Sequence, residues 1–486
     1  MNKLFQIYAT LFAICLCTSC IDEKSLYITP QKISYLYPYA NEKSHSDAEI
    51  TIELKNGHVS AQEIIENGIC IPPLKYNKSM LVMLTQDDCI HTAFCRTWAV
   101  IHGKPVSDSN PFRLASAGAH QLLYDAHQLL NGDLPPNIIT AQKTLGCTDG
   151  CGNETRFSFT TTIAPEEKWM NVQSKVMFSE TTDYARFYNK SGLSWYDIVE
   201  LLNYGTGIAF HDVKAADVNV AENIREHFII AQDSILKHLA GRGCKMLAEP
   251  NGNKTYLEAA QAYEPIRTLT AQTGTIRLNP FSVNGDLSKK VLHRAFYNSP
   301  AEVKNAIETQ MKVPAETREA VHIGVHNTDN GWTDFLLWLN DTYGKDGEDC
   351  VWMPGQEEYY EYNYYRLNSH ISIAQIDASS FKLTVNLPGE KFFYYPSTTI
   401  NLPGISMYDI VSIEGNDALT GLSYADYKDG IMLNIDCRKY LFEHAENFVK
   451  RYEANPSDAS NKADALYFVN ILKESAKKEA LKKRLQ

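Results

Sequence analysis

The sequence predicts an α/β protein whose parallel core is followed by a β-rich region, and three observations support this. From about residue 78 to 340, short apolar runs alternate with helix-like segments. After about 371, short β-rich segments are separated by turns that contain proline and glycine. Between 21 and 70, strand-like segments precede the core. Alternating strands and helices are typical of parallel sheets, whereas short strands with frequent turns are typical of sandwiches.

The strands expected in the parallel core are the apolar runs SMLVMLT, TGIAFHD, CKMLAEP and AVHIGVH. Helix-like segments such as LSWYDIVELLNYG separate them. A stretch from 104 to 190, rich in Tyr, Thr and Asn, interrupts the alternation, and we expect it to be an insertion that faces the substrate as a flap.

Length and charge limit the possible functions. A chain of 486 residues is too long for one ordinary core and predicts two or three domains. The formal net charge of -12 argues against a nucleic-acid partner, because binding to a phosphate backbone requires a basic surface.

The amino terminus has the features of an export signal. Lys3 precedes an apolar run, Leu4 to Leu16, that is too short to span a bilayer permanently. Small residues before Cys20 resemble a bacterial lipobox, which implies cleavage after residue 19 and attachment of lipid to Cys20. Asp22 and Glu23 resemble the acidic export signals of Bacteroidetes surface lipoproteins. We therefore expect an exported lipoprotein on the periplasmic or outer-membrane, cell-surface side, with the membrane as a partner through its anchor.

These patterns predict four regions. Residues 1–19 form the signal peptide, and 20–74 contain the anchor and an amino-terminal β segment. Residues 75–370 form the (β/α) core with its insertion, and 371–486 form a β-sandwich followed by terminal helices. Because export to an oxidising compartment permits disulfides, we expect Cys147 and Cys151 to pair; a zinc site there has less support, because no histidine lies nearby in sequence.

Polar residues follow each apolar run of the parallel core. Because a parallel barrel projects its strand ends onto one face, these groups can converge despite their separation in sequence. In chain order, the groups are Thr85-Gln86-Asp87-Asp88, Phe210-His211-Asp212, Glu249-Pro250-Asn251-Gly252 and His322-Ile323-Gly324-Val325-His326.

This order resembles that of the NodB-type polysaccharide deacetylases, which remove acetyl groups from glycans with a divalent metal. TQDDC is similar to the first motif of that family, T-F-D-D-G, and WYDIVELLNYGTGIAFHDVKA resembles the second. AEPNG is similar to the third motif, R-x-P-Y-G, and HIGVHN resembles the last. The resemblance extends over about 75 to 366 and implies a distorted (β/α) barrel.

The resemblance also implies roles for individual residues. Asp87 would be the general base, and Asp88 and His211 would bind zinc or a similar ion. His326 would protonate the leaving amine or alkoxide. These residue types suit the chemistry, because a metal acidifies water, a carboxylate accepts a proton and an imidazole delivers one.

The sequence departs from the family pattern at four positions. Ala215 replaces the second histidine of motif two, and Ala248 replaces the arginine that orients the base. Gln86 stands in place of phenylalanine, and Asn251 in place of tyrosine. The third metal ligand is therefore missing at its usual position, and Asp212 and Asp217 are the alternatives.

Several residues allow a structural as well as a functional interpretation. One of Asp87 and Asp88 could cap a following helix. His322 shares the strand side of His326, so either could be functional. Trp332 is a candidate sugar platform together with Asn251 as a substrate contact, and core burial is the alternative for Trp332.

The sequence thus predicts metal-dependent deacetylation of a polysaccharide or oligosaccharide. The alternative is a catalytically inactive, glycan-binding lipoprotein of the same fold. A glycoside hydrolase that uses Glu357 and Glu358 has less support, because adjacent acidic residues more often begin a helix than flank a sugar bond.

Overall fold

The computed structural model describes residues 45–55, 59–107, 138–140, 143–171, 176–177, 187–188 and 192–486. The signal peptide, Cys20 and much of the expected insertion lie outside these residues. Within the described ranges, no helix combines the length and apolarity needed to cross a membrane.

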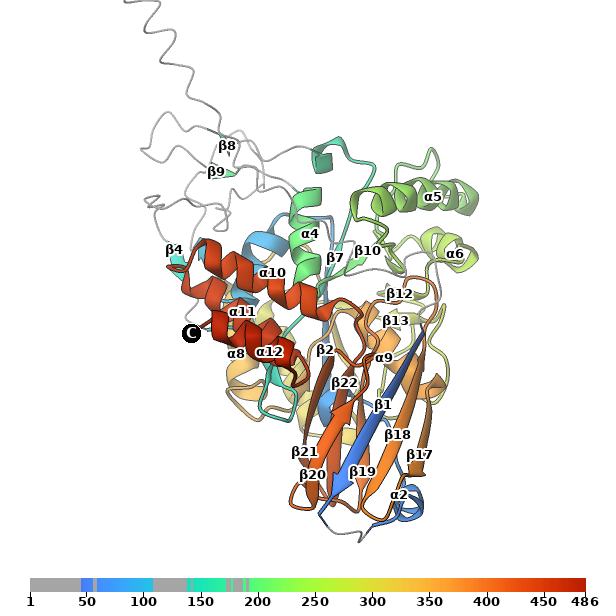
Figure 1. Cartoon of the computed structure of the whole chain (residues 1–486). Coiled ribbons are helices and arrows are strands. Elements are labelled where there is room, and N and C mark those ends of the chain that lie inside the picture. Colours follow the sequence, from blue (N-terminus) through green and yellow to red (C-terminus); the bar gives the residue numbers. More distant parts are fainter. Residues whose placement is uncertain are drawn as a thin grey trace, which may run out of the picture.

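Parallel strands form the central part of the molecule (Figure 1). They are β2 (Met80–Gln86), β7 (Thr160–Thr162), β10 (Gly207–Ala209), β11 (Met246–Ala248), β12 (Thr268–Ala271), β13 (Val291–His293), β14 (Ala295–Phe296), β15 (Val321–Val325) and β16 (Val351–Trp352). One sheet has the order β10-β7-β2-β15-β14 with β16 also paired to β2, and a second has the order β11-β12-β13. Every pairing in both sheets is parallel, which confirms the α/β prediction.

The first five residues of β2 are all apolar, because neighbouring elements cover both faces of the strand. All seven of its residues are buried, and it pairs with β7, β15 and β16. A strand covered on both faces cannot alternate apolar and polar side chains, as the run MLVML shows. The sheets are linked at two places. A parallel bridge joins Phe210 to Leu247, and only Arg294 separates β13 from β14.

Helices alternate with these strands, as predicted. They are α3 (Ala99–Ile101), α4 (Trp195–Asn203), α5 (Ala221–His238), α6 (Lys254–Ala262), α7 (Pro300–Met311), α8 (Asn330–Tyr343) and α9 (Gln356–Asn368), with a π-helix at Ala93–Trp98 before α3. Side chains cap several of them. Ser194 and Asp197 form a capping box on α4, and Ser299 caps α7 ahead of a proline at its first position. Such caps satisfy backbone N–H groups that have no partner within the helix.

Two antiparallel sheets lie beside the parallel part (Figure 1). The first contains β17 (His370–Gln375), β18 (Ser380–Pro388), β1 (His45–Leu54) and β20 (Ile410–Gly415), and the second contains β19 (Ser397–Pro403), β22 (Gly430–Asp436) and β21 (Gly421–Tyr427), in these orders. Both sheets contribute to one apolar cluster, which includes Ile50, Leu383, Ile400 and Leu433. The amino-terminal strand β1 therefore completes a sheet whose other strands come after residue 369. The short helix α2 (Ala61–Asn67) follows β1.

Three helices end the chain: α10 (Leu441–Ala454), α11 (Ala459–Ile471) and α12 (Ala476–Arg484). They pack against the parallel part. The rings of Phe448 and Phe468 stack with their centres 4.2 Å apart, and both rings contact Tyr204. Short paired strands and turns complete the described chain: β3 (Pro105–Ser107), β4 (Ile138–Thr140), β5 (Gly146–Thr148), β6 (Glu154–Arg156), β8 (Val176–Met177), β9 (Phe187–Tyr188) and 3-10 turns at Lys75–Asn77, Lys168–Asn171 and Ala315–Thr317.

Candidate metal centre

Asp87 and Asp88 follow β2 and point into different surroundings. Asp87 is buried, whereas the Asp88 side chain is 48% exposed. Asp88 and Cys89 both have left-handed backbone, with φ of 60° and 51°, and this turns the chain sharply after the strand. Neither aspartate caps the next helix, whose N-cap residue is Thr92. The structure therefore contradicts the capping alternative.

His211 follows β10 and turns one ring nitrogen toward both aspartates. Its Nδ1–H donates to the carbonyl of Ala248 at 2.8 Å. Its Nε2 lies 3.3 Å from Oδ1 of Asp88 and 3.8 Å from Oδ2 of Asp87. A histidine whose Nδ1 is fixed by a carbonyl presents Nε2 to a metal, which is the usual arrangement of imidazole ligands.

His211 and Asp88 shift each other's pKa. Burial opposes protonation of His211, yet its hydrogen bond with Asp88 and the charge of Asp87 raise its pKa above the ordinary value. The hydrogen bond from His211 lowers the pKa of Asp88, aided by the charges of His326 and Arg294 and opposed by partial burial. Asp88 is thus held ionised, as a carboxylate ligand must be.

Asp212 stands next to these groups and supplies a third donor. One ligand atom each from Asp88, His211 and Asp212 lie within 4.8 Å of one another. Asp217, the other alternative from the sequence, instead accepts hydrogen bonds from the backbone and side-chain amides of Asn219. Two carboxylates and one imidazole suit zinc or a similar divalent ion, so the residues present fit the metal that the resemblance implies.

Arg294 also belongs to the site, although none of the four sequence motifs contains it. It is buried between β13 and β14, and its Nη1 donates to Oδ1 of Asp87 at 2.5 Å. Its Nη2 donates to the carbonyl of Glu249 at 3.0 Å, next to Ala248. A guanidinium from the residue between β13 and β14 therefore contacts Asp87, whereas the family motif that the sequence resembles would have its arginine at position 248. An arginine inside the strand-like run VLHRAF was the available signal, because a buried charge requires a partner.

The departure at Gln86 has a structural explanation. The Gln86 amide donates to Oγ1 of Thr92 and to the carbonyl of His326, and its oxygen accepts from Thr97. This fully buried side chain therefore ties the end of β2 to the end of β15, where His326 begins the next loop.

Of the two histidines near β15, His326 is the one beside Asp88. Its Nε2 lies 3.9 Å from Oδ2 of Asp88, and its side chain is 54% exposed. His322 is buried and contacts Oγ1 of Thr85 at 2.9 Å. Burial, with help from the charges of Arg294 and His293, holds the pKa of His322 well below its usual value. His322 is therefore neutral and enclosed, whereas His326 is accessible.

The two predicted substrate contacts have different surroundings. Asn251 is exposed after β11 and has left-handed backbone, with φ of 53°. Trp332 is 7% exposed and packs edge-on against Phe335 in the core. This placement corresponds to core burial, the alternative to a sugar platform, because a stacking surface must be open to the ligand.

Eight cysteines lie in the described chain, and none forms a disulfide there. The expected Cys147–Cys151 pair is therefore wrong. Cys147 is buried on β5, while Cys151 lies in the turn after it and contacts the amide of Asn434. The four-residue spacing that suggested a bridge instead belongs to a turn held by Asp149, which accepts from the backbone N–H groups of Cys151 and Asn153.

Comparison with known proteins identifies the family. The model of a family described as putative polysaccharide deacetylase matches residues 48–486. The chain belongs to this family, and the match extends beyond the 75–366 range of the resemblance into the antiparallel sheets and the terminal helices. No curated protein matches the chain.

Proposed function

We propose that this protein hydrolyses N- or O-acetyl groups on a polysaccharide or oligosaccharide with a divalent metal held by Asp88, His211 and Asp212. The observation that carries the proposal is the convergence of separate strand ends: Asp88 lies within 4 Å of both His211 and His326. Family membership supports a carbohydrate substrate and a hydrolase.

We further propose that the parallel strands form the distorted barrel of this family. The pairings run from β11 through β12 to β13, continue past Arg294 to β14, β15, β2, β7 and β10, and return to β11 through the Phe210–Leu247 bridge. The shared apolar cluster of the two antiparallel sheets supports a sandwich. In this arrangement, Asp87 and His211 both follow the carboxyl ends of strands, where such barrels keep their chemistry.

Different side chains accept and donate the protons that hydrolysis requires. When bound, the metal would supply Lewis acidity toward the acetyl carbonyl and the attacking water. Asp87, oriented by Arg294, accepts a proton from that water as it attacks the carbonyl carbon. His326 donates a proton to the nitrogen or oxygen that leaves, and its exposure allows contact with the substrate. Acetate and the free amine or hydroxyl are the products.

One observation favours the alternative of an inactive glycan-binding protein. Ala215 removes the second histidine of the family motif, and the replacement Asp212 is exposed at the edge of the site. A carboxylate in place of an imidazole makes the donor set harder and changes which ion it prefers. Activity therefore depends on whether Asp212 completes the site.

Metal analysis combined with acetate release distinguishes the two functions. We expect the purified protein to bind one divalent ion per chain and to release acetate from an acetylated chito-oligosaccharide or xylan. Asp88→Ala should lose both the ion and the activity. Retained sugar binding without any ion or acetate release would establish the binding protein instead.

We also propose that the protein is exported and anchored to a membrane through Cys20, on the periplasmic or outer face. The signal-like amino terminus supports this, although these residues lie outside the described chain. Labelled palmitate should be incorporated into the wild-type chain and not into Cys20→Ser. Equal labelling of both would contradict the assignment.

A further inference from the structure

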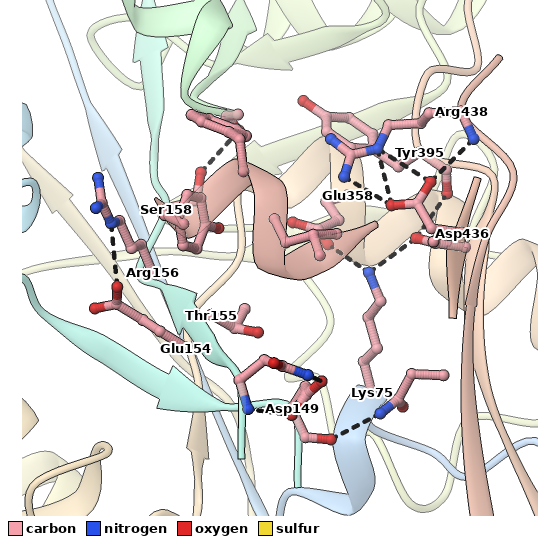
Figure 2. Close-up of a pocket in the computed structure, with 18 of the residues that line it drawn as sticks. Lys75, Asp149, Glu154, Thr155, Arg156, Ser158, Glu358, Tyr395, Asp436 and Arg438 are labelled. Atoms are coloured by element: carbon pink, nitrogen blue, oxygen red, sulfur yellow. Dashed lines mark hydrogen bonds and ion pairs between the residues drawn. The ribbon is translucent and has the colours of Figure 1, made fainter. Parts of the chain in front are cut away.

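A polar cavity, separate from the candidate metal centre, lies between the parallel part and the antiparallel sheets. Its volume is about 140 Å³, and Figure 2 shows many of the side chains that line it. Ser158 and Gly205 on its wall precede β7 and β10, whereas His211 follows β10. The cavity therefore lies toward the amino ends of the parallel strands, away from the candidate metal centre.

The charges that line this cavity nearly cancel. Three cations and four acidic side chains contribute to its wall. Lys75 pairs with Glu358 at 3.0 Å, and Arg438 pairs with Asp436 at 2.7 Å. His444 is neutral, because burial and the nearby arginines lower its pKa to about 3. Because the cations do not outnumber the acidic side chains, the cavity lacks the positive electrostatic potential that an anionic ligand requires.

The 3-10 turn Lys75–Asn77 places strained backbone at the cavity. Tyr76 has φ of 61° and ψ of 22°, a conformation that bulky residues rarely adopt. Its backbone N–H donates to Oγ1 of Thr399 at 2.8 Å, and the Lys75 ammonium lies 5.2 Å from its ring. This turn brings a cation and an aromatic ring together on one wall, and both belong to the cavity lining.

The loop around Asp149 forms another part of the wall and is firmly held. Oδ2 of Asp149 accepts from Ser423 at 2.7 Å, and its carbonyl accepts from the amide of Asn434 at 2.8 Å. The segment GCTDGCGN, which contains Cys147 and Cys151, thus attaches β5 and β6 to the antiparallel sheet that contains β21 and β22. The next residues, Glu154 and Thr155, face the cavity (Figure 2).

Hydrogen-bonding capacity remains available at the cavity wall. Within the described chain, neither the Thr155 hydroxyl nor Oε2 of Glu358 takes part in a hydrogen bond. The Lys75 ammonium donates to Glu358 and to Ser397, so one of its three N–H groups remains available. The half-buried Tyr395 and Tyr467 also line the cavity, and Arg156 lies 4.4 Å from the centre of the Tyr467 ring. A ligand here would meet fixed donors, fixed acceptors and rings within a small, charge-balanced space.

We propose that this cavity binds a neutral saccharide unit, separately from the metal centre. Sugar hydroxyls donate and accept hydrogen bonds at once, so they match a wall that offers both, and their C–H faces pack against tyrosine rings. A position at the junction of two layers is common for ligand sites. The cavity would hold one sugar unit of a glycan while an acetyl group elsewhere on the same glycan is hydrolysed at the metal centre. Binding of the sugar in the cavity does not require an active metal centre.

Binding of simple sugars to the full-length protein tests this proposal. The probes are glucose, galactose, mannose and N-acetylglucosamine, with glucuronate as the anionic counterpart of glucose, and the readout is calorimetry or ligand-observed NMR. We expect at least one neutral sugar to bind, and glucuronate to bind more weakly than glucose. Thr155→Val should weaken binding about 3- to 10-fold, as expected for one lost hydrogen bond.

Two control variants separate this site from others. Thr384→Val, on β18 of the antiparallel sheet, matches the change in size and polarity and should leave binding unchanged. Asp87→Asn, at the metal centre, should also leave binding of the simple sugars unchanged. Binding that is absent for all four sugars, stronger for glucuronate, insensitive to Thr155→Val or lost in Asp87→Asn would each overturn the proposal.

Discussion

The two ends of the parallel strands differ in the exposure of their charged side chains, apart from the buried Asp87–Arg294 pair at the carboxyl end. At the carboxyl ends, Asp88 and His326 are about half exposed, and their ring nitrogen and oxygen lie 3.9 Å apart without a close hydrogen bond. At the amino ends, Arg242, Glu357, Lys245 and Glu361 form a network whose side chains are completely buried, with contacts of 2.5 Å and 2.6 Å. Asp88 and His326 are therefore accessible to a metal or a substrate, whereas the charges of the buried network neutralise one another.

The buried network also explains two adjacent acids. Glu357 and Glu358 begin α9, as expected from the sequence, and each pairs with a different cation. Glu357 further accepts from the backbone N–H of Ile208, at the start of β10. These carboxylates therefore hold α9 to the ends of the strands and do not form a glycosidase pair.

The largest predicted effect concerns the carboxyl end. Asp87→Asn should lower acetate release by about 10²- to 10⁴-fold, because the amide cannot accept the proton of the attacking water. Metal content should remain close to one ion per chain, since Asp87 is not among the three converging ligands. Elemental analysis beside the activity assay checks this, and simultaneous loss of metal would contradict the separate roles of Asp87 and Asp88.

At the opposite end, we expect a loss of stability with no loss of chemistry. Asp464 on α11 is buried and accepts from Lys104, Arg156 and Tyr204. Asp464→Asn removes the charge that balances a buried lysine, so the free energy of unfolding should fall by about 3–5 kcal/mol. Urea denaturation measures it, with the exposed Asp334→Asn as a control within about 0.5 kcal/mol. Activity per folded molecule should be unchanged; an equal loss in both variants would contradict this interpretation.

Arg294 allows a sharper test of the carboxyl end. Arg294→Lys keeps the charge but cannot contact Asp87 and the carbonyl of Glu249 at once. We expect kcat to fall about 10- to 100-fold with little change in KM, as is typical when a partner that orients a site residue is altered. Arg277→Lys, at an exposed arginine, should have no effect. A change confined to KM would show that Arg294 acts on binding.

The smallest predicted effect is a pH dependence of stability from the amino end. His444 is buried, and its pKa of about 3 lies below the ordinary 6.5. The unfolded chain takes up a proton below pH 6.5 while the folded chain does not, so stability decreases as pH falls from 7 to 5. For this group the loss is about 2 kcal/mol. Urea denaturation of His444→Gln should show a shallower decrease than wild type; an unchanged slope would contradict the assignment.

The sequence predicted the carboxyl end of the strands better than it predicted the rest of the molecule. Asp87, Asp88, His211 and His326 each follow an apolar run, so the alternation that predicts parallel strands also predicts that they converge. Arg294 was missed because the short run VLHRAF was not among the four apolar runs expected to be strands of the parallel core. Asp212 remained one of two alternatives, since ligand geometry depends on loop conformation.

Long-range contacts explain the remaining differences. The sequence indicated that β1 is a strand, but its antiparallel partners β18 and β20 lie more than 300 residues away, and periodicity does not identify a partner. The cysteine spacing suggested a disulfide, yet hydrogen bonds of Asp149 shape that turn. Trp332 could be assigned to the core only when its packing against Phe335 was known.

The most direct test of the metal centre is a crystal soaked in a zinc salt and measured at the zinc absorption edge. We expect one strong anomalous peak within about 2.2 Å of Nε2 of His211 and of a carboxylate oxygen from each of Asp88 and Asp212. A fully occupied peak elsewhere, with none beside His211, would contradict it.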